Sequence, residues 1–308
     1  SSADKTIKLW DVKTGVEIAA LTGHKYEIYC CDCSPVAELL VTAGGFDPDV
    51  YLWDIKKGEL KRVLTGHQDG VYCCAISPDG QTIASGSPDC TVRFWDVESG
   101  MEIKKLTNLG AVSSIVFSQD GRMIAFINNE EMRIRVIFAK SYRQKAVFSS
   151  SKSFYSSCDF SPDGNILAAG NELGQAEFWD IQSKAIKMTL DCHKKPVSAC
   201  SFSPDGQTLV TGGEDDEIKL WHADTGALIG VFFGHSGMVS SCNYSPDGEM
   251  IVSTSYDQSV KVWNAEGEKG ELKFTGHKGE IGDFAFVADD HLALSMGSDN
   301  TFRLWDYR

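Results

Sequence analysis

The residue types in this 308-residue chain that could support chemistry are ten cysteines and seven histidines. Most of the cysteines fall in apolar runs such as IYCCDC (28–33) and VYCCAI (71–76), where a free thiol behaves as a small buried hydrophobe. The chain has neither a GxSxG nucleophile turn nor a glycine loop that could hold a phosphate. We therefore expect no enzymatic activity, no metal and no cofactor. Unpaired cysteines are typical of the cytoplasm and the nucleus.

The overall charge limits the class of partner. The formal net charge is −14 and the isoelectric point is about 4.9, so the phosphates of nucleic acids would be repelled and basic proteins attracted. The alternative is that the acidic surface only serves solubility. No apolar run reaches the roughly 18 residues that a membrane span needs, and the first residues do not resemble a signal peptide. Because the chain does not begin with Met, we expect it to be a piece of a longer or processed protein.

A repeat of 42 residues organises the chain. Seven tryptophans end strand-like runs, and Ile137 stands at the midpoint of the one double-length gap, so the steps are 43 and then six of 42. Gly-His pairs recur in phase at 23–24, 66–67, 234–235 and 276–277, and Cys192-His193 is in register with them. Ser-Pro pairs form a third marker, usually followed by Asp-Gly. The tryptophans are Trp10, Trp53, Trp95, Trp179, Trp221, Trp263 and Trp305.

Each repeat predicts four short strands. In the second repeat these are residues 71–77, 82–87, 91–96 and 102–106, which are apolar or β-branched and are separated by turns rich in Pro, Asp and Gly. Pro-Asp-Gly supplies both the fixed φ and the positive φ that tight turns require.

Three markers in phase over the whole chain make it resemble the WD40-repeat family. The resemblance implies an all-β, seven-bladed β-propeller of residues 1–308 as a single domain, in which a blade is a sheet of four antiparallel strands. It also implies that the N-terminal outer strand, residues 16–21, joins the C-terminal blade and closes the ring. Residues 1–11 would then be an extra strand, because they compete with residues 301–306 for one position.

The resemblance further implies a buried hydrogen-bonded set of His, Ser or Thr, Asp and Trp in each blade. Because the set recurs five times at one register, we interpret it as structural rather than as a catalytic triad. The third repeat has Asn108, Phe126, Glu131 and Ile137 at these positions, and the fourth has Ser151, Ala169, Leu173 and Trp179. The five complete sets are His24, Thr42, Asp47, Trp53; His67, Ser85, Asp89, Trp95; His193, Thr211, Asp215, Trp221; His235, Ser253, Asp257, Trp263; and His277, Ser295, Asp299, Trp305.

The resemblance implies a partner site on the face that carries the Gly-His loops. Several aromatic residues occur there beside carboxylates, a combination that suits Lys or Arg side chains. The alternative is that these rings only cover the loops. The predicted partner-binding residues are Glu27, Tyr29, Phe46, Tyr72, Met238, Tyr256 and Glu280.

Two further segments could bind partners. A basic stripe in repeats three and four could dock RNA or an acidic partner, or it could be a solvated outer strand. The C-terminal Trp305-Asp306-Tyr307-Arg308 resembles a short box through which some WD-repeat proteins act as substrate receptors of cullin-RING ubiquitin ligases. The stripe consists of Arg133, Arg135, Lys140, Arg143, Lys145 and Lys152.

Together these observations predict a non-catalytic scaffold that binds a basic peptide of another protein. We expect a monomeric ring in the cytoplasm or nucleus, within a multi-protein complex. We expect no small-molecule substrate, no membrane partner and no nucleic acid. The alternatives are the ubiquitin-ligase receptor and the basic stripe as the binding site.

Overall fold

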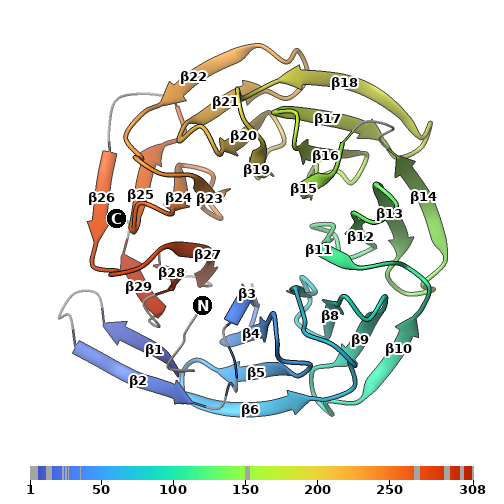
Figure 1. The fold of residues 1–308 in the computed structure, drawn as a ribbon, viewed down its shortest axis with the longest axis vertical. Coiled ribbons are helices and arrows are strands. Elements are labelled where there is room, and N and C mark those ends of the chain that lie inside the picture. The colour runs from blue at the N-terminus through green and yellow to red at the C-terminus, as the bar shows by residue number, and fades with distance from the viewer. Residues whose placement is uncertain are drawn as a thin grey trace. The chain divides into compact units, whose positions relative to one another are not determined.

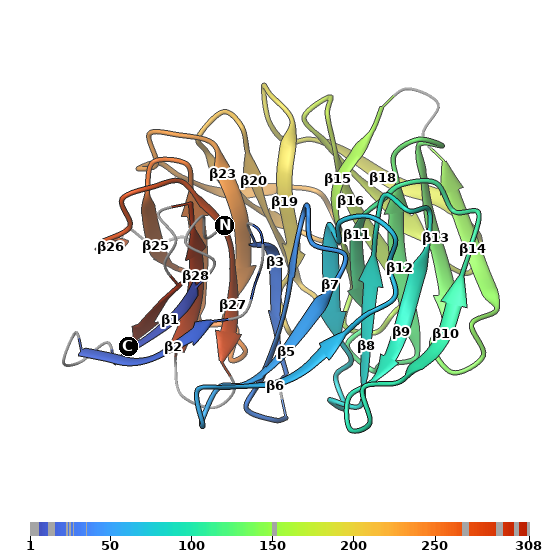
Figure 2. The same ribbon diagram turned by 60° about the horizontal axis from the view of Figure 1, so that its bottom comes forward.

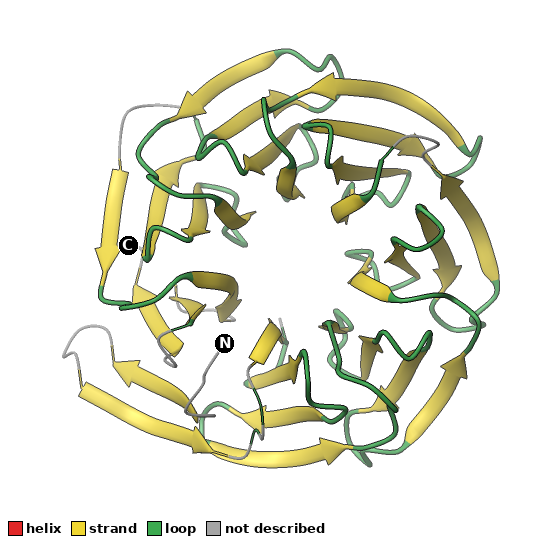
Figure 3. Ribbon diagram, in the orientation of Figure 1, coloured by secondary structure: helices red, strands yellow, loops and turns green. Residues whose placement is uncertain are grey.

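The computed structural model describes residues 6–11, 16–22, 24, 26, 28–34, 36–149, 153–266, 271–287, 292–298 and 302–306. Over these residues every regular element is a β-strand, and the strands β1 to β29 are joined by turns and loops (Figure 3). The described residues therefore include no helix that could cross a membrane. The chain divides into two compact units, residues 1–115 with 276–308 and residues 116–275, and the division falls inside β11.

Six sheets contain four antiparallel strands each, and the strands follow chain order from one edge of the sheet to the other (Figure 1). The sheets are β3 (Ile28–Cys33), β4 (Leu39–Gly44), β5 (Val50–Asp54), β6 (Glu59–Leu64); β7 (Cys73–Ile76), β8 (Thr82–Gly86), β9 (Val92–Asp96), β10 (Glu102–Leu106); β11 (Val112–Phe117), β12 (Met123–Asn128), β13 (Arg133–Phe138), β14 (Gln144–Ser149); β15 (Tyr155–Phe160), β16 (Ile166–Asn171), β17 (Gln175–Asp180), β18 (Ala185–Asp191); β19 (Val197–Phe202), β20 (Thr208–Gly213), β21 (Ile218–His222), β22 (Leu228–Phe232); and β23 (Val239–Tyr244), β24 (Met250–Ser255), β25 (Ser259–Asn264), β26 (Glu271–Thr275).

Two smaller sheets complete the described strands. The strands β27 (Ile281–Val287), β28 (Leu292–Gly297) and β29 (Phe302–Asp306) form a three-stranded sheet. The strands β1 (Thr6–Asp11) and β2 (Val16–Thr22) form a two-stranded sheet. The four strands predicted for the second repeat are confirmed as β7 to β10.

The Ser-Pro-Asp-Gly marker forms the turn between the first two strands of a sheet. In the second repeat the hydroxyl of Ser77 donates to the Asp79 carboxylate at 2.5 Å and accepts the N–H of Thr82 at 2.9 Å. Gly80 follows with a φ of 68°, a conformation that favours glycine. The marker therefore predicts a turn because its side chains replace backbone hydrogen bonds across it.

In the first unit the strands β27, β3 and β7 lie side by side, each from a different sheet (Figure 2). One buried cluster joins Ile28, Trp53 and their neighbours to Leu294 and Met296 of the three-stranded sheet. A second cluster joins the sheet β3–β6 to the sheet β7–β10. Burial of apolar side chains between successive sheets is thus what stabilises the unit.

The second unit follows the same principle. Its strands β15, β19 and β23 are neighbours. Three apolar clusters fill the spaces between successive sheets from β12 to β25. Each cluster contains one buried tryptophan, namely Trp179, Trp221 or Trp263.

The expectation of seven four-stranded blades, closed by residues 16–21, is wrong. The described residues contain six such sheets, and β2 pairs with β1 rather than with β29. Trp10 lies opposite Glu17, in the register that places Trp53 opposite Leu60. Residues 6–11 are therefore paired, and a short hairpin costs less chain entropy than closure between the two ends of the chain.

Candidate functional site

The sets of His, hydroxyl, Asp and Trp form connected hydrogen-bond chains. In the second repeat His67 lies with Nδ1 2.9 Å from Asp89 and Nε2 2.8 Å from the Ser85 hydroxyl. That hydroxyl also accepts the indole N–H of Trp95 at 2.9 Å. His67, Ser85 and Trp95 are buried, so no substrate can reach the hydroxyl. The arrangement is a structural network and not a nucleophilic centre.

The same geometry recurs at His193 and His235. Their Nδ1 atoms lie 2.8 and 2.9 Å from Asp215 and Asp257, and their Nε2 atoms lie 2.9 and 2.8 Å from Thr211 and Ser253. Near the C-terminus, the Ser295 hydroxyl accepts the indole N–H of Trp305 at 2.7 Å and lies 2.8 Å from Nε2 of His277. Asp299, the fourth member of this set, lies outside the described residues.

Burial and hydrogen bonding change the pKa values of the histidines and aspartates in these networks. Burial lowers the pKa of His67 and of His193, which favours the neutral ring. Burial alone would raise the pKa of Asp89, but hydrogen bonds from Thr91, Gln68 and His67 outweigh it and lower the pKa to about 2. A neutral imidazole therefore donates from Nδ1 to a carboxylate and accepts the hydroxyl proton at Nε2.

Three repeats depart from this geometry, and the third repeat has none of the four residue types at these positions. In the first repeat, Nε2 of His24 lies 2.7 Å from the Thr42 hydroxyl, but its Nδ1 lies 3.8 Å from the Asp47 carboxylate. That carboxylate accepts the Tyr51 hydroxyl instead. In the fourth, Ala169 replaces the hydroxyl, and the buried indole nitrogen of Trp179 has no hydrogen-bond partner among the described residues, which do not include Ser151.

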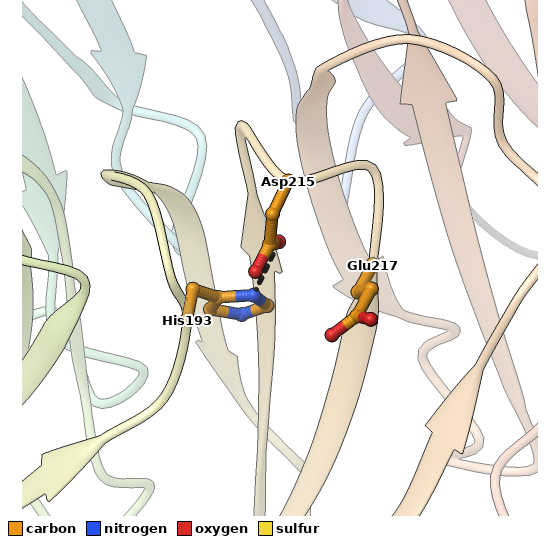
Figure 4. Close-up of side chains that lie close together, drawn as sticks. All are labelled: His193, Asp215 and Glu217. Carbon is orange, nitrogen blue, oxygen red and sulfur yellow. Dashed lines mark hydrogen bonds and ion pairs between the residues drawn. The ribbon is translucent and has the colours of Figure 1, made fainter.

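Figure 4 shows His193, Asp215 and Glu217, whose ligand-type atoms lie within 4.8 Å of one another. Both ring nitrogens of His193 already have partners, and the Glu217 carboxylate lies 3.0 Å from the Lys219 ammonium. A metal ion would have to displace all of these contacts. The cluster is therefore better explained by the hydrogen-bond network than by metal binding.

Three residues of the predicted partner site form an exposed aromatic cluster in the first unit. Tyr29, Phe46 and Tyr72 have 42%, 66% and 42% of their surface exposed. The Tyr29 ring centroid lies 6.3 Å from that of Phe46 and 6.3 Å from that of Tyr72. The sequence placed these rings on one face, and the structure brings them into contact.

Two glycines support this aromatic cluster. A Cβ atom on Gly45 would lie 2.1 Å from the Tyr29 ring, and one on Gly70 would lie 1.8 Å from the carbonyl oxygen of Gly45. The backbone N–H of Val71 donates to the carbonyls of Gly44 and Asp47, which joins the two loops. Only glycine permits this close approach of ring and backbone.

The carboxylates near the aromatic cluster are Asp69 and Glu280. Asp69 is exposed and accepts the N–H of Gly70 at 2.8 Å. Glu280 is exposed and directly precedes β27, the strand beside β3. Glu27 lies outside the described residues, and Asp69 was not among the predicted site residues although it stands in the same loop as Tyr72.

Met238 and Tyr256 belong to the second unit. The backbone N–H of Tyr256 donates to the carbonyl of Met238 at 3.0 Å, so these two residues lie together. Tyr256 is exposed and Met238 is half-buried. That they share one site with the aromatic cluster stays a prediction.

The basic stripe is partly neutralised. Glu131 lies 3.2 Å from Arg133 and 2.9 Å from Arg135, and the Lys145 ammonium lies 5.6 Å from the Phe138 ring centre. Lys140 and Arg143 are exposed, and Lys152 lies outside the described residues. Of the C-terminal box, Trp305 is buried, whereas Tyr307 and Arg308 lie outside the described residues.

The sequence analysis missed two carboxyl groups that connect neighbouring sheets. Asp32 accepts the N–H of Ile76, and Asp159 accepts the N–H of Phe202, both at 2.8 Å. Burial raises the pKa of Asp32 to about 7 and that of Asp159 to about 6. Both stand two residues before a Ser-Pro pair, which is the signal that could have identified them.

Comparison with known proteins supports the repeat assignment. A family model described as WD domain, G-beta repeat, matches residues 15–54, 58–96, 143–180, 184–222, 226–264 and 269–306. The unmatched residues 97–142 include the third repeat, which lacks the hydrogen-bonded set.

Three curated relatives are similar over part of the chain. Guanine nucleotide-binding protein subunit beta-5b of Danio rerio is 36% identical over 58% of this chain and 46% of its own length. Protein tipD of Dictyostelium discoideum is 27% identical over 63% of this chain and 32% of its own length. Autophagy-related protein 16 of Arabidopsis thaliana is 26% identical over 64% of this chain and 39% of its own length. The chain thus spans less than half the length of these relatives.

Proposed function

Since the chain belongs to the WD40-repeat family, we propose that it is a non-catalytic scaffold that binds a basic peptide of a partner protein through the aromatic cluster Tyr29, Phe46 and Tyr72. The buried histidine networks supply no accessible nucleophile. The family assignment supports a role in protein interactions, and the net charge of −14 favours a basic partner. We place this activity in the cytoplasm or the nucleus, where buried free cysteines remain reduced.

The observation that carries the proposal is the exposure of three aromatic rings, of which Tyr29 contacts both Phe46 and Tyr72. Exposed aromatic residues in contact are frequent anchors of protein interfaces. An Arg or Lys side chain can lie over a ring face, while Asp69 and Glu280 attract its charged end. Rings supported by a glycine backbone also lose little freedom on binding.

The test begins by isolating partners with the wild-type chain and then measures affinity by calorimetry. Tyr72→Ala should weaken binding of the identified peptide at least about tenfold, because it removes one of the three aromatic anchors. Glu280→Gln should flatten the salt dependence with a smaller effect on affinity.

Phe233→Ala is the matched control, because Phe233 is 68% exposed and lies in the second unit. It should change affinity less than about twofold, as expected for a residue outside the binding site. If binding instead depends on Arg133, Arg135 and Arg143 and not on Tyr72, the basic stripe is the site and the proposal is wrong.

A further inference from the structure

A cleft of about 1000 Å³ lies in the second unit, between the turns of the sheets β15–β18 and β19–β22. One wall is the turn after β15 together with the end of β17, and the other is the turn after β19 together with the end of β21. Ile166, Phe178, Phe202 and Ala223 provide apolar walls. This volume is at the upper end of the range for ligand-binding clefts and can hold several peptide residues.

Four carboxylates line the cleft, namely Asp163, Asp180, Asp205 and Asp224, with Lys187 as its one cationic lining residue. The Ser161 hydroxyl holds the pKa of Asp163 below its usual value, and the Ser203 hydroxyl does the same for Asp205. The backbone N–H of Ser183 lowers the pKa of Asp180. These three charges are therefore ionised at neutral pH and are held in fixed directions by their own turns.

A cation of the chain itself already lies in this cleft. The Lys187 ammonium, on β18, reaches across to Asp224 in the turn of the neighbouring sheet, at 3.7 Å. Both side chains are substantially exposed, 49% for Lys187 and 94% for Asp224. An exposed pair of this kind is weak, so a guanidinium or ammonium from another protein can replace it.

His222 stands at a position that several other repeats fill with an aspartate and one with Asn264. Asp54, Asp96 and Asp180 follow a tryptophan, and each accepts a backbone N–H of the turn behind it at 2.6–2.9 Å. His222 takes that position after Trp221, is exposed and lines the cleft. The turn behind it is closed by the backbone, with the N–H of Gly226 donating to the His222 carbonyl at 2.8 Å.

We propose that this cleft is a second docking site of the scaffold, which takes an Arg- or Lys-rich segment of a partner protein. The methylene chain of the basic residue lies against the apolar walls, and its charged end replaces Lys187 beside the carboxylates. Arginine is favoured over lysine because a guanidinium can contact two carboxylates at once. The site lies in the second unit and does not depend on the aromatic cluster.

The experiment measures binding of a fluorescein-labelled hexa-arginine peptide by fluorescence anisotropy. Asp180→Asn with Asp205→Asn should weaken binding about fivefold, since two exposed charge contacts are lost. Asparagine keeps the oxygen that accepts the turn N–H, so the turns are preserved. Circular dichroism confirms folding of each variant.

The matched control is Asp79→Asn with Asp96→Asn, at the equivalent turn positions of the first unit. It removes the same two charges and should change affinity less than about twofold, because weak surface charges act over short distances in salt. Equal weakening in both double variants would show diffuse attraction to an acidic surface and would overturn the proposal. So would an absence of binding to the wild type.

Lys187→Met provides an independent measurement. Removing the internal competitor should tighten hexa-arginine binding about two- to threefold, whereas Lys104→Met on β10 should not. Because the aromatic cluster can also take Arg side chains, Tyr29→Ala with Tyr72→Ala provides a background that isolates the cleft. In that background hexa-arginine should still bind, and Asp180→Asn with Asp205→Asn should still weaken binding about fivefold. If the aromatic variant alone abolishes binding, the peptide binds the aromatic cluster, and the cleft proposal fails while the proposed function stands.

Discussion

Among the described residues the indole N–H of Trp179 has no hydrogen-bond partner, and this leads to a prediction about the free energy of unfolding. In five other repeats a tryptophan N–H donates to a Ser or Thr hydroxyl at 2.7–3.0 Å. Ala169 takes that place in the fourth repeat and is opposite Glu177, as Ser85 is opposite Arg93. Ala169→Ser should therefore place a hydroxyl beside the Trp179 N–H.

The magnitude follows from a gain at the indole N–H and a smaller loss at the new hydroxyl. A buried donor without a partner costs about 1–3 kcal/mol, and a hydrogen bond contributes about 0.5–1.5 kcal/mol net. The new hydroxyl has no histidine beside it in the described residues to accept its own proton, which offsets part of this gain. We expect Ala169→Ser to raise the free energy of unfolding by about 0.5–1 kcal/mol.

The assay combines thermal unfolding with the indole N–H signal of Trp179 in NMR spectra. The control is Ala168→Ser, because Ala168 is equally buried but packs in a different apolar cluster. That hydroxyl should find no donor and should destabilise the chain by about 1–3 kcal/mol. Equal destabilisation by both substitutions, with an unchanged indole signal, would refute the reasoning.

Two further predictions concern the first unit. Burial raises the pKa of Asp32 from 3.8 to about 7, so the folded state loses stability as the pH rises from 4 to 7. Asp32→Asn should remove this loss, with a gain of about 4 kcal/mol at pH 8 and little at pH 4. Parallel melting-temperature profiles for both proteins would contradict this prediction. Deletion of residues 1–11 should leave a folded chain in which β2 pairs with β29, so amide exchange over Phe302–Asp306 should slow. If the shortened chain unfolds, or if amide exchange over Phe302–Asp306 does not change, β2 cannot replace β1 and the prediction is wrong.

The sequence predicted the strands and the buried networks well because both depend on short spacings. The turn formed by Ser77, Asp79 and Gly80 is local, and the His67 network repeats the spacing of four others. The pairing of β2 could not be predicted in this way, because TIKLWD and TFRLWD offer it nearly identical partner strands. The cleft was missed because Asp163, Asp180 and Asp205 look like ordinary turn residues in the sequence.

Three residues of the predicted partner site, Tyr29, Phe46 and Tyr72, lie together in one cluster of the structure. Tyr29 and Tyr72 occupy equivalent positions of successive repeats, so the repeat places them near each other. The contact of Tyr29 with Phe46 depends on the missing side chain at Gly45, which no periodicity reports. Whether an aromatic residue lies in contact with another is decided by packing across sheets rather than by the repeat.

The contact of Gly70 with the Gly45 carbonyl has a consequence for how a partner is selected. The base under the Tyr29 ring is main chain at Gly45, and Gly70 packs directly against that main chain, so the shape of this base does not depend on rotamer changes. A rigid surface of this kind selects among peptides by excluding those whose shape does not fit. A methionine-rich surface, in contrast, can repack its side chains around different peptides. Substituting Gly70 by alanine should separate the two loops and broaden the range of peptides accepted while weakening each of them.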